Sequence, residues 1–100
     1  GMTAVKVDGR VLVDWQATIR THLPMVGRYV PDAMPAMREM LGVLESAVWG
    51  DLPIAVEHLA HWRLILGKAA ADTEVGFLKA ALTSVADQIT AVLGHDEAVA

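Results

Sequence analysis

The pattern of apolar and polar residues changes from a strand period to a helical period early in the chain. Two β-branched runs within residues 4–13 flank Asp8 and Gly9. Asp-Gly is a preferred pair for a type I′ turn, because both central residues of that turn need positive φ. The pattern predicts a β-hairpin over about residues 4–13, with Val7 opposite Arg10. A lone two-stranded hairpin is marginal in water, so it must pack on helices or pair with another copy.

Helical periodicity follows the hairpin, with apolar residues three and four positions apart. We predict four helices, over about residues 14–23, 33–49, 52–68 and 73–94. Asp14 suits the N-cap of the first helix, and Pro24 is expected to end that helix. Gly50 is placed to end the second helix, and Asp51 and Pro53 are typical of the start of the third. This short connection predicts that the second and third helices are antiparallel neighbours.

The third predicted helix is the most apolar helical segment of the chain. Its broad apolar face carries Leu52, Ala55, Leu59, Trp62 and Leu66. Arg63 falls within the apolar arc, so it needs an acidic partner or must reach the rim of the face. A helix that is apolar nearly all round is central or lies at an interface. We therefore expect the other helices to pack against this one.

The fourth predicted helix has the clearest heptad pattern. Its apolar residues follow 3-4-3-4-3 spacing: Val75, Leu78, Leu82, Val85, Ile89 and Val92. Such a seam predicts close packing against another helix, either in the same chain or in a second copy. The expected fold class is therefore mainly α, with an N-terminal β-hairpin followed by a four-helix bundle-like domain. Residues 1–100 are expected to form a single domain.

Composition limits the classes of function. Hydrophobic residues make up 54% of the chain, and this excess predicts a subunit interface, most simply in a homodimer. The longest run without a charge has eight residues, too short for a membrane span of about 20. A net charge of -4 with scattered basic residues argues against a nucleic-acid partner. No secretory leader is visible, so a cytoplasmic location of bacterial type is expected.

The candidate chemistry lies on the third predicted helix, where Glu57, His58 and His61 are close in sequence. Residues three and four apart on a helix are neighbours, and carboxylate and imidazole groups suit zinc or iron. The histidines are three apart and the glutamate precedes both, unlike the zincin pattern H-E-x-x-H. Further ligands would have to come from His22, Glu45, Asp87 or His95. The alternatives are a solvated polar stripe, in which Glu57 and His61 form an i,i+4 pair, and a pH-responsive interface histidine.

His22 lies on the apolar side of the first predicted helix. We interpret it as a histidine at the edge of the core, bonded to a backbone carbonyl. The alternative is a metal ligand.

Two functional hypotheses follow from these patterns. The chain has no cysteine, no Gly-rich phosphate loop and no GxSxG motif, and no catalytic or cofactor-binding residue is predicted. This favours a small helical interaction or regulatory module that self-associates through apolar helix surfaces and can bind a protein partner. The alternative is a metal-binding protein or small metal-dependent enzyme that uses His58, His61 and Glu57.

Overall fold

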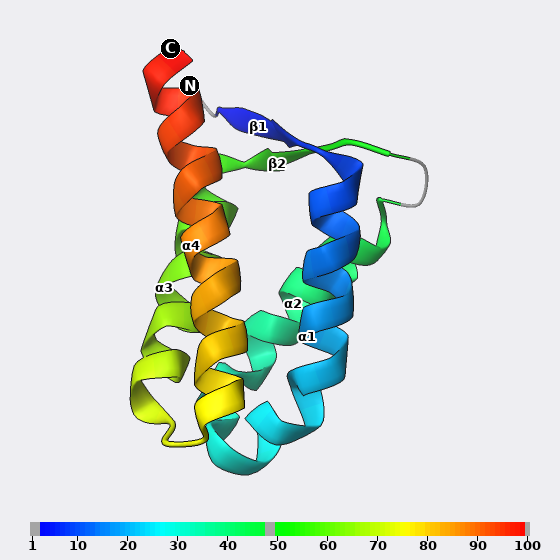
Figure 1. Ribbon diagram of the computed structural model, residues 1–100. Helices are drawn as coiled ribbons and strands as arrows, with labels where there is room; N and C mark the ends of the chain where they lie inside the picture. Colours follow the sequence, from blue (N-terminus) through cyan, green and yellow to red (C-terminus); the bar gives the residue numbers. More distant parts are fainter. Residues whose placement is uncertain (1–2, 48–49, 100) are drawn as a thin grey trace.

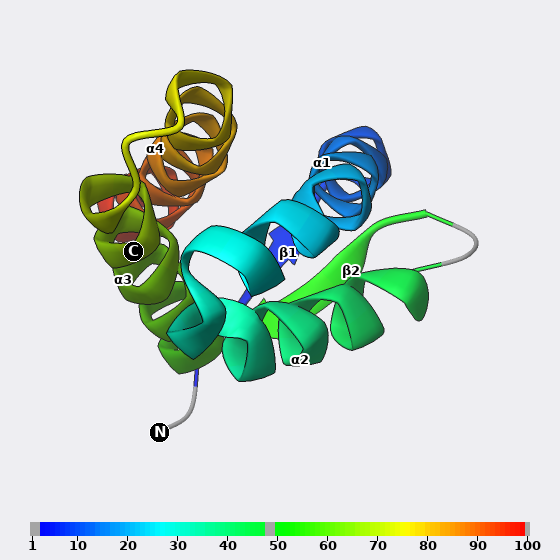
Figure 2. The same ribbon diagram turned by 90° about the horizontal axis from the view of Figure 1, so that it is seen from below.

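The computed structural model describes residues 3–47 and 50–99, and it has a mainly α fold. The elements in chain order are β1 (Ala4–Val7), α1 (Gly9–Tyr29), the short 3-10 helix η1 (Pro31–Ala33), α2 (Met34–Glu45), β2 (Leu52–Ala55), α3 (Val56–Asp72) and α4 (Gly76–Val99). The two antiparallel strands lie across one end of the helices (Figure 1). Seen along the helices, α4 lies beside α3, and α1 lies beside α2 (Figure 2). The predicted fold class is confirmed.

The partner of the first strand differs from the prediction. β1 pairs with β2, with Val5 opposite Ile54, and does not form a hairpin with the residues that follow Gly9. Asp8 is the N-cap of α1, and its side chain accepts a hydrogen bond of 2.7 Å from the Arg10 N–H. Aspartate is favoured both in a type I′ turn and at an N-cap. The hairpin predicted over residues 4–13 is therefore wrong in its second strand.

The residues that resembled the start of the third helix instead form strand β2. The Asp51 carboxylate does cap a helix, but it accepts a hydrogen bond of 2.9 Å from the Gly9 N–H of α1. A Cβ on Gly9 would lie 3.0 Å from the Gly50 backbone, so glycine permits this close approach. Gly50 has φ +138°, a conformation that glycine adopts without strain. Gly50 and Asp51, just before β2, therefore dock against the start of α1.

The helices differ from their predicted bounds mainly at their ends. α1 spans residues 9–29 and continues through Pro24, whereas residues 14–23 were predicted. Pro24 lies on the exposed side of α1, where water can solvate the carbonyl of Arg20 that loses its helical donor. The other three helices were predicted over 33–49, 52–68 and 73–94 but span 34–45, 56–72 and 76–99. The Thr73 hydroxyl accepts a bond of 3.2 Å from the Val75 N–H in the turn between α3 and α4.

The core lies between the four helices and the inner face of the sheet. Among the described residues, Trp15 of α1 and Trp62 of α3 are the largest fully buried side chains. Four residues of the predicted heptad seam of α4 are buried, and the partner helix is α3 of the same chain: Leu78, Leu82, Val85 and Ile89. The Trp15 indole N–H donates a hydrogen bond of 2.9 Å to the Gln88 side-chain carbonyl, which joins α1 to α4. Among the described residues, no helix is long and apolar enough to cross a membrane.

Candidate functional site

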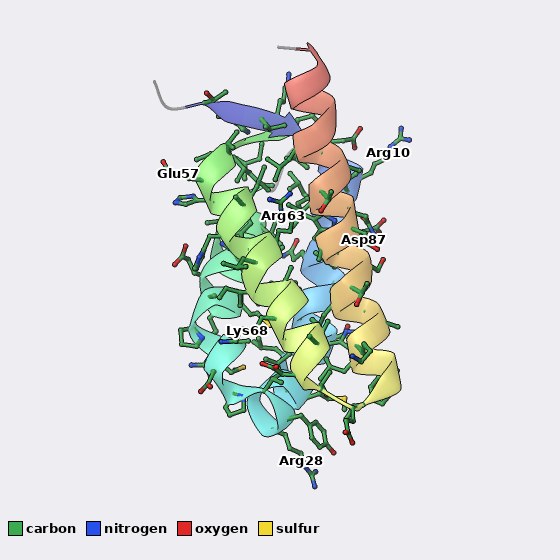
Figure 3. The ribbon with its side chains drawn as sticks, turned by 90° about the vertical axis from the view of Figure 1, so that its left-hand side faces the viewer. Arg10, Arg28, Glu57, Arg63, Lys68 and Asp87 are labelled. Carbon is green, nitrogen blue, oxygen red and sulfur yellow. The ribbon has the colours of Figure 1, made fainter. Side chains whose placement is uncertain are left out.

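The predicted Glu and His residues lie on the first two turns of α3. Glu57, His58 and His61 are all exposed, on the side of α3 opposite its buried residues. Glu57 projects away from the bundle (Figure 3). Its place in the first turn favours a negative charge, because the N-terminus of a helix is the positive end of the helix dipole.

The ring of His58 lies at the side of this exposed surface that is nearer the core. Its ring stacks on the indole of Trp62, with centroids 5.9 Å apart and an angle of 25° between the planes. Trp62 is 1% exposed, and its Nε1 is the one buried side-chain nitrogen or oxygen without a hydrogen-bond partner among the described residues. The His58 ring thus covers an indole at the edge of the core.

Among the described side chains, none adds a further ligand to these histidines. Within residues 3–47 and 50–94, no three His, Asp or Glu side chains form a group that could hold a metal ion. Glu45 faces Arg20 of α1, at 3.5 Å. Asp87 projects from α4 away from α3 (Figure 3), and the side chain of His95 lies outside the described residues. Glu57, His58 and His61 therefore share a helix surface but form no assembled metal site here.

His22 is confirmed as a histidine at the edge of the core. Its Nδ1 donates to the carbonyl oxygen of Thr18, at 2.7 Å, one turn earlier in α1. The ring also lies against Phe77 of α4, with centroids 6.3 Å apart. These contacts place the His22 ring between two helices, where its Nδ1 is already engaged.

A small cavity lies between η1 and the C-terminal half of α3. Its volume is about 260 Å³, slightly below the usual range for ligand pockets of about 300–1,000 Å³. Its charged lining residues are Asp32, Lys68 and Asp72. No hydrogen bond or ion pair among the described residues joins these three side chains. The structure therefore assembles no hydrogen-bonded acid–base pair from these three side chains.

The outer face of α4 is a shallow, open surface lined by small and polar residues. It is formed by Gly76, Lys79, Ala80, Thr83, Ser84, Asp87, Gln88 and Ala91. Sequence reasoning did not single out these small residues, although they recur at helical spacing opposite the heptad seam. Phe77 borders it and is 59% exposed.

Further large apolar side chains are exposed on the other helices. Leu64 of α3 is 67% exposed, and Val13 and Tyr29 of α1 are 57% and 45% exposed. Arg63, which the sequence placed within an apolar arc, is itself exposed. The surface of α3 around Leu64 and Arg63 is therefore open to contact by another molecule.

Protein-family models, characterised proteins and solved structures were compared with the chain, and none of them matches it.

Proposed function

We propose that this protein is a small helical interaction or regulatory module that self-associates through its apolar helix surfaces. The observation that supports this proposal best is the outer face of α4, defined above. Its small side chains leave the helix backbone accessible, and exposed Phe77 lies at its border. Small residues at a helix interface let two helices approach closely, and an aromatic side chain at the margin can then be covered.

The charges on this face are complementary to a second copy of the same face. Lys79 and Asp87 are eight residues apart, which is about 12 Å along a helix at 1.5 Å per residue. They differ by about 80° around the helix axis, at 100° per residue. When two copies of α4 pack antiparallel with their Thr83 residues at the centre, Lys79 of each copy comes level with Asp87 of the other. A two-fold axis forms both ion pairs at once, as expected of an isologous dimer.

A charge-exchange experiment tests this arrangement. Lys79→Asp or Asp87→Lys alone places like charges opposite each other and should raise the dimer dissociation constant roughly tenfold. The double variant K79D/D87K restores opposite charges and should recover the wild-type constant. Sedimentation equilibrium at low salt measures all three, because salt screens exposed charges.

The matched control is Glu39→Lys on α2, which makes the same change of charge as Asp87→Lys at another exposed position. It should leave the dissociation constant unchanged. A double variant as weak as the single variants would reject the α4 pairing. A wild-type chain that sediments as a monomer throughout would reject self-association itself.

A further inference from the structure

We infer that the outer edge of β1 is a second contact surface, and that its partner is β1 of another copy of this chain. The two β1 strands pair antiparallel across a two-fold axis, so that the two small sheets join into one of four strands. This inference rests on the proposed self-association, but it concerns backbone hydrogen bonds and uses none of the α4 residues.

The hydrogen bond that closes the sheet fixes which backbone groups of β1 face outward. The Val56 N–H donates to the carbonyl oxygen of Thr3, at 2.9 Å. In an antiparallel pair this bond flanks a non-hydrogen-bonded position, which is Ala4 opposite Ala55. Alternation then makes Val5 and Ile54 a hydrogen-bonded pair. Lys6 and Pro53 form the next non-hydrogen-bonded pair.

The N–H and C=O groups of Ala4 and Lys6 therefore point away from β2. Among the described residues, no backbone hydrogen bond from outside the sheet reaches either of them. β1 is the outermost strand at this end of the molecule, beyond β2 (Figure 1). Through Ala4 and Lys6, the four-residue strand β1 thus offers two donors and two acceptors in the spacing that an added strand requires.

The two edges of the sheet are not equivalent. Pro53 occupies a non-hydrogen-bonded position of β2, so its nitrogen points to the outer edge of β2 and carries no hydrogen. Proline on an edge strand is a known way to prevent strand addition. The β2 edge is blocked at its centre, whereas the β1 edge is open.

The open edge is complementary to itself. Because Ala4 and Lys6 are symmetric about Val5, a two-fold axis at Val5 places Ala4 of each copy opposite Lys6 of the other. This register forms four hydrogen bonds, since both Ala4–Lys6 pairs exchange two. It also places no two Lys6 side chains directly opposite each other, where like charges would destabilise the pair. Val5 remains on the buried face, so the joined sheet keeps one apolar side.

Residue-resolved amide hydrogen exchange tests the inference on the intact chain. The Val5 and Val7 amides donate within the sheet and should be protected at every protein concentration. The Ala4 and Lys6 amides should exchange freely in dilute solution and become at least tenfold more protected as the chain assembles. The contrast between neighbouring amides separates strand pairing from general burial of this end.

A proline substitution tests the same bonds by equilibrium. Lys6→Pro removes an outward-facing donor and leaves the ladder to β2 intact, as Pro53 does on the opposite strand. Two of the four intermolecular bonds are lost, so the dissociation constant of this contact should rise roughly 25-fold, at about fivefold per bond. Lys6→Ala is the matched control, because it removes the charge but keeps the N–H. It should associate at least as tightly as the wild type.

The outcomes separate this inference from the proposed function. If the chain assembles while the Ala4 and Lys6 amides stay unprotected, the β1 contact is wrong and self-association stands. If wild-type chain is monomeric at all concentrations, both are wrong. Circular dichroism checks that Lys6→Pro is folded, and if it is not, the exchange pattern of the wild-type chain decides alone.

Discussion

Replacing each buried tryptophan with phenylalanine should destabilise the protein by clearly different amounts. Trp15 and Trp62 are 0% and 1% exposed, so the two substitutions remove similar buried apolar area and leave similar voids. Their indole N–H groups differ. That of Trp15 donates to Gln88 at 2.9 Å, whereas that of Trp62 is buried without a partner among the described residues. The comparison therefore isolates the cost of burying a polar group.

The magnitude follows from these two environments. Trp15→Phe loses a hydrogen bond worth about 1 kcal/mol net. The carbonyl of exposed Gln88 can then be solvated by water, so little further cost arises. Trp62→Phe removes an unsatisfied N–H whose burial costs about 1–3 kcal/mol, which offsets part of the void. Trp15→Phe should therefore cost about 2–4 kcal/mol more free energy of unfolding than Trp62→Phe.

Urea unfolding followed by far-ultraviolet circular dichroism measures this difference without relying on tryptophan fluorescence. All variants are compared at one protein concentration, because association changes apparent stability. Gln88→Leu and the double variant W15F/Q88L complete a double-mutant cycle with Trp15→Phe, and this cycle should give a coupling energy of about 1 kcal/mol. Equal costs for the two tryptophan substitutions, or a larger cost for Trp62→Phe, would refute the reasoning.

Four further substitutions test how the helices are built, each by urea unfolding. Gly67 lies within α3, and nothing lies near a Cβ added there, so Gly67→Ala should stabilise the protein by about 1 kcal/mol. Gly9→Ala should destabilise the protein, because its Cβ would lie 3.0 Å from the Gly50 backbone. Asp51→Ala removes the acceptor for the first N–H of α1 and should cost about 1 kcal/mol. Pro24→Ala restores a helical donor to the Arg20 carbonyl and should stabilise by about 1–2 kcal/mol. An unchanged or opposite shift in any of them would contradict the corresponding contact.

The helices could be predicted from the sequence because their signals are local. The α4 seam needed only the spacing of Leu78, Leu82 and Val85 to be recognised. The start of α1 was missed although Leu12 lies three residues before Trp15 and continues its buried face. Asp8 is favoured both in a type I′ turn and at a helix N-cap, and the spacing of apolar residues in this segment did not distinguish the two.

The strand pairing depended on residues far apart in the sequence. The carboxylate of Asp51 accepts a hydrogen bond from the Gly9 N–H, 42 residues earlier in the chain. This bond forms at the first residue of α1, in the segment where a turn was predicted. The exposure of Glu57 and His61 followed from their place opposite the apolar face of α3, but the absence of an assembled metal site among the described residues required the structure. The signals of single residues were thus interpreted correctly more often than the distant residues that they contact.

The two proposed contacts together make a prediction about assembly size. Each is isologous, since the α4 face and the β1 edge are both complementary to themselves. Two different isologous contacts on one chain close into a tetramer when their two-fold axes meet at right angles, and extend into an open chain of subunits when the axes do not meet. Analytical ultracentrifugation distinguishes a limiting tetramer from open-ended growth. If both contacts form, Lys6→Pro and Asp87→Lys should each weaken one of them and shift the assembly toward a dimer, and the double variant should shift it toward the monomer. A double variant that assembles as tightly as the wild type would show that a different surface joins the subunits, and the face of α3 around Leu64 would then be the next to test.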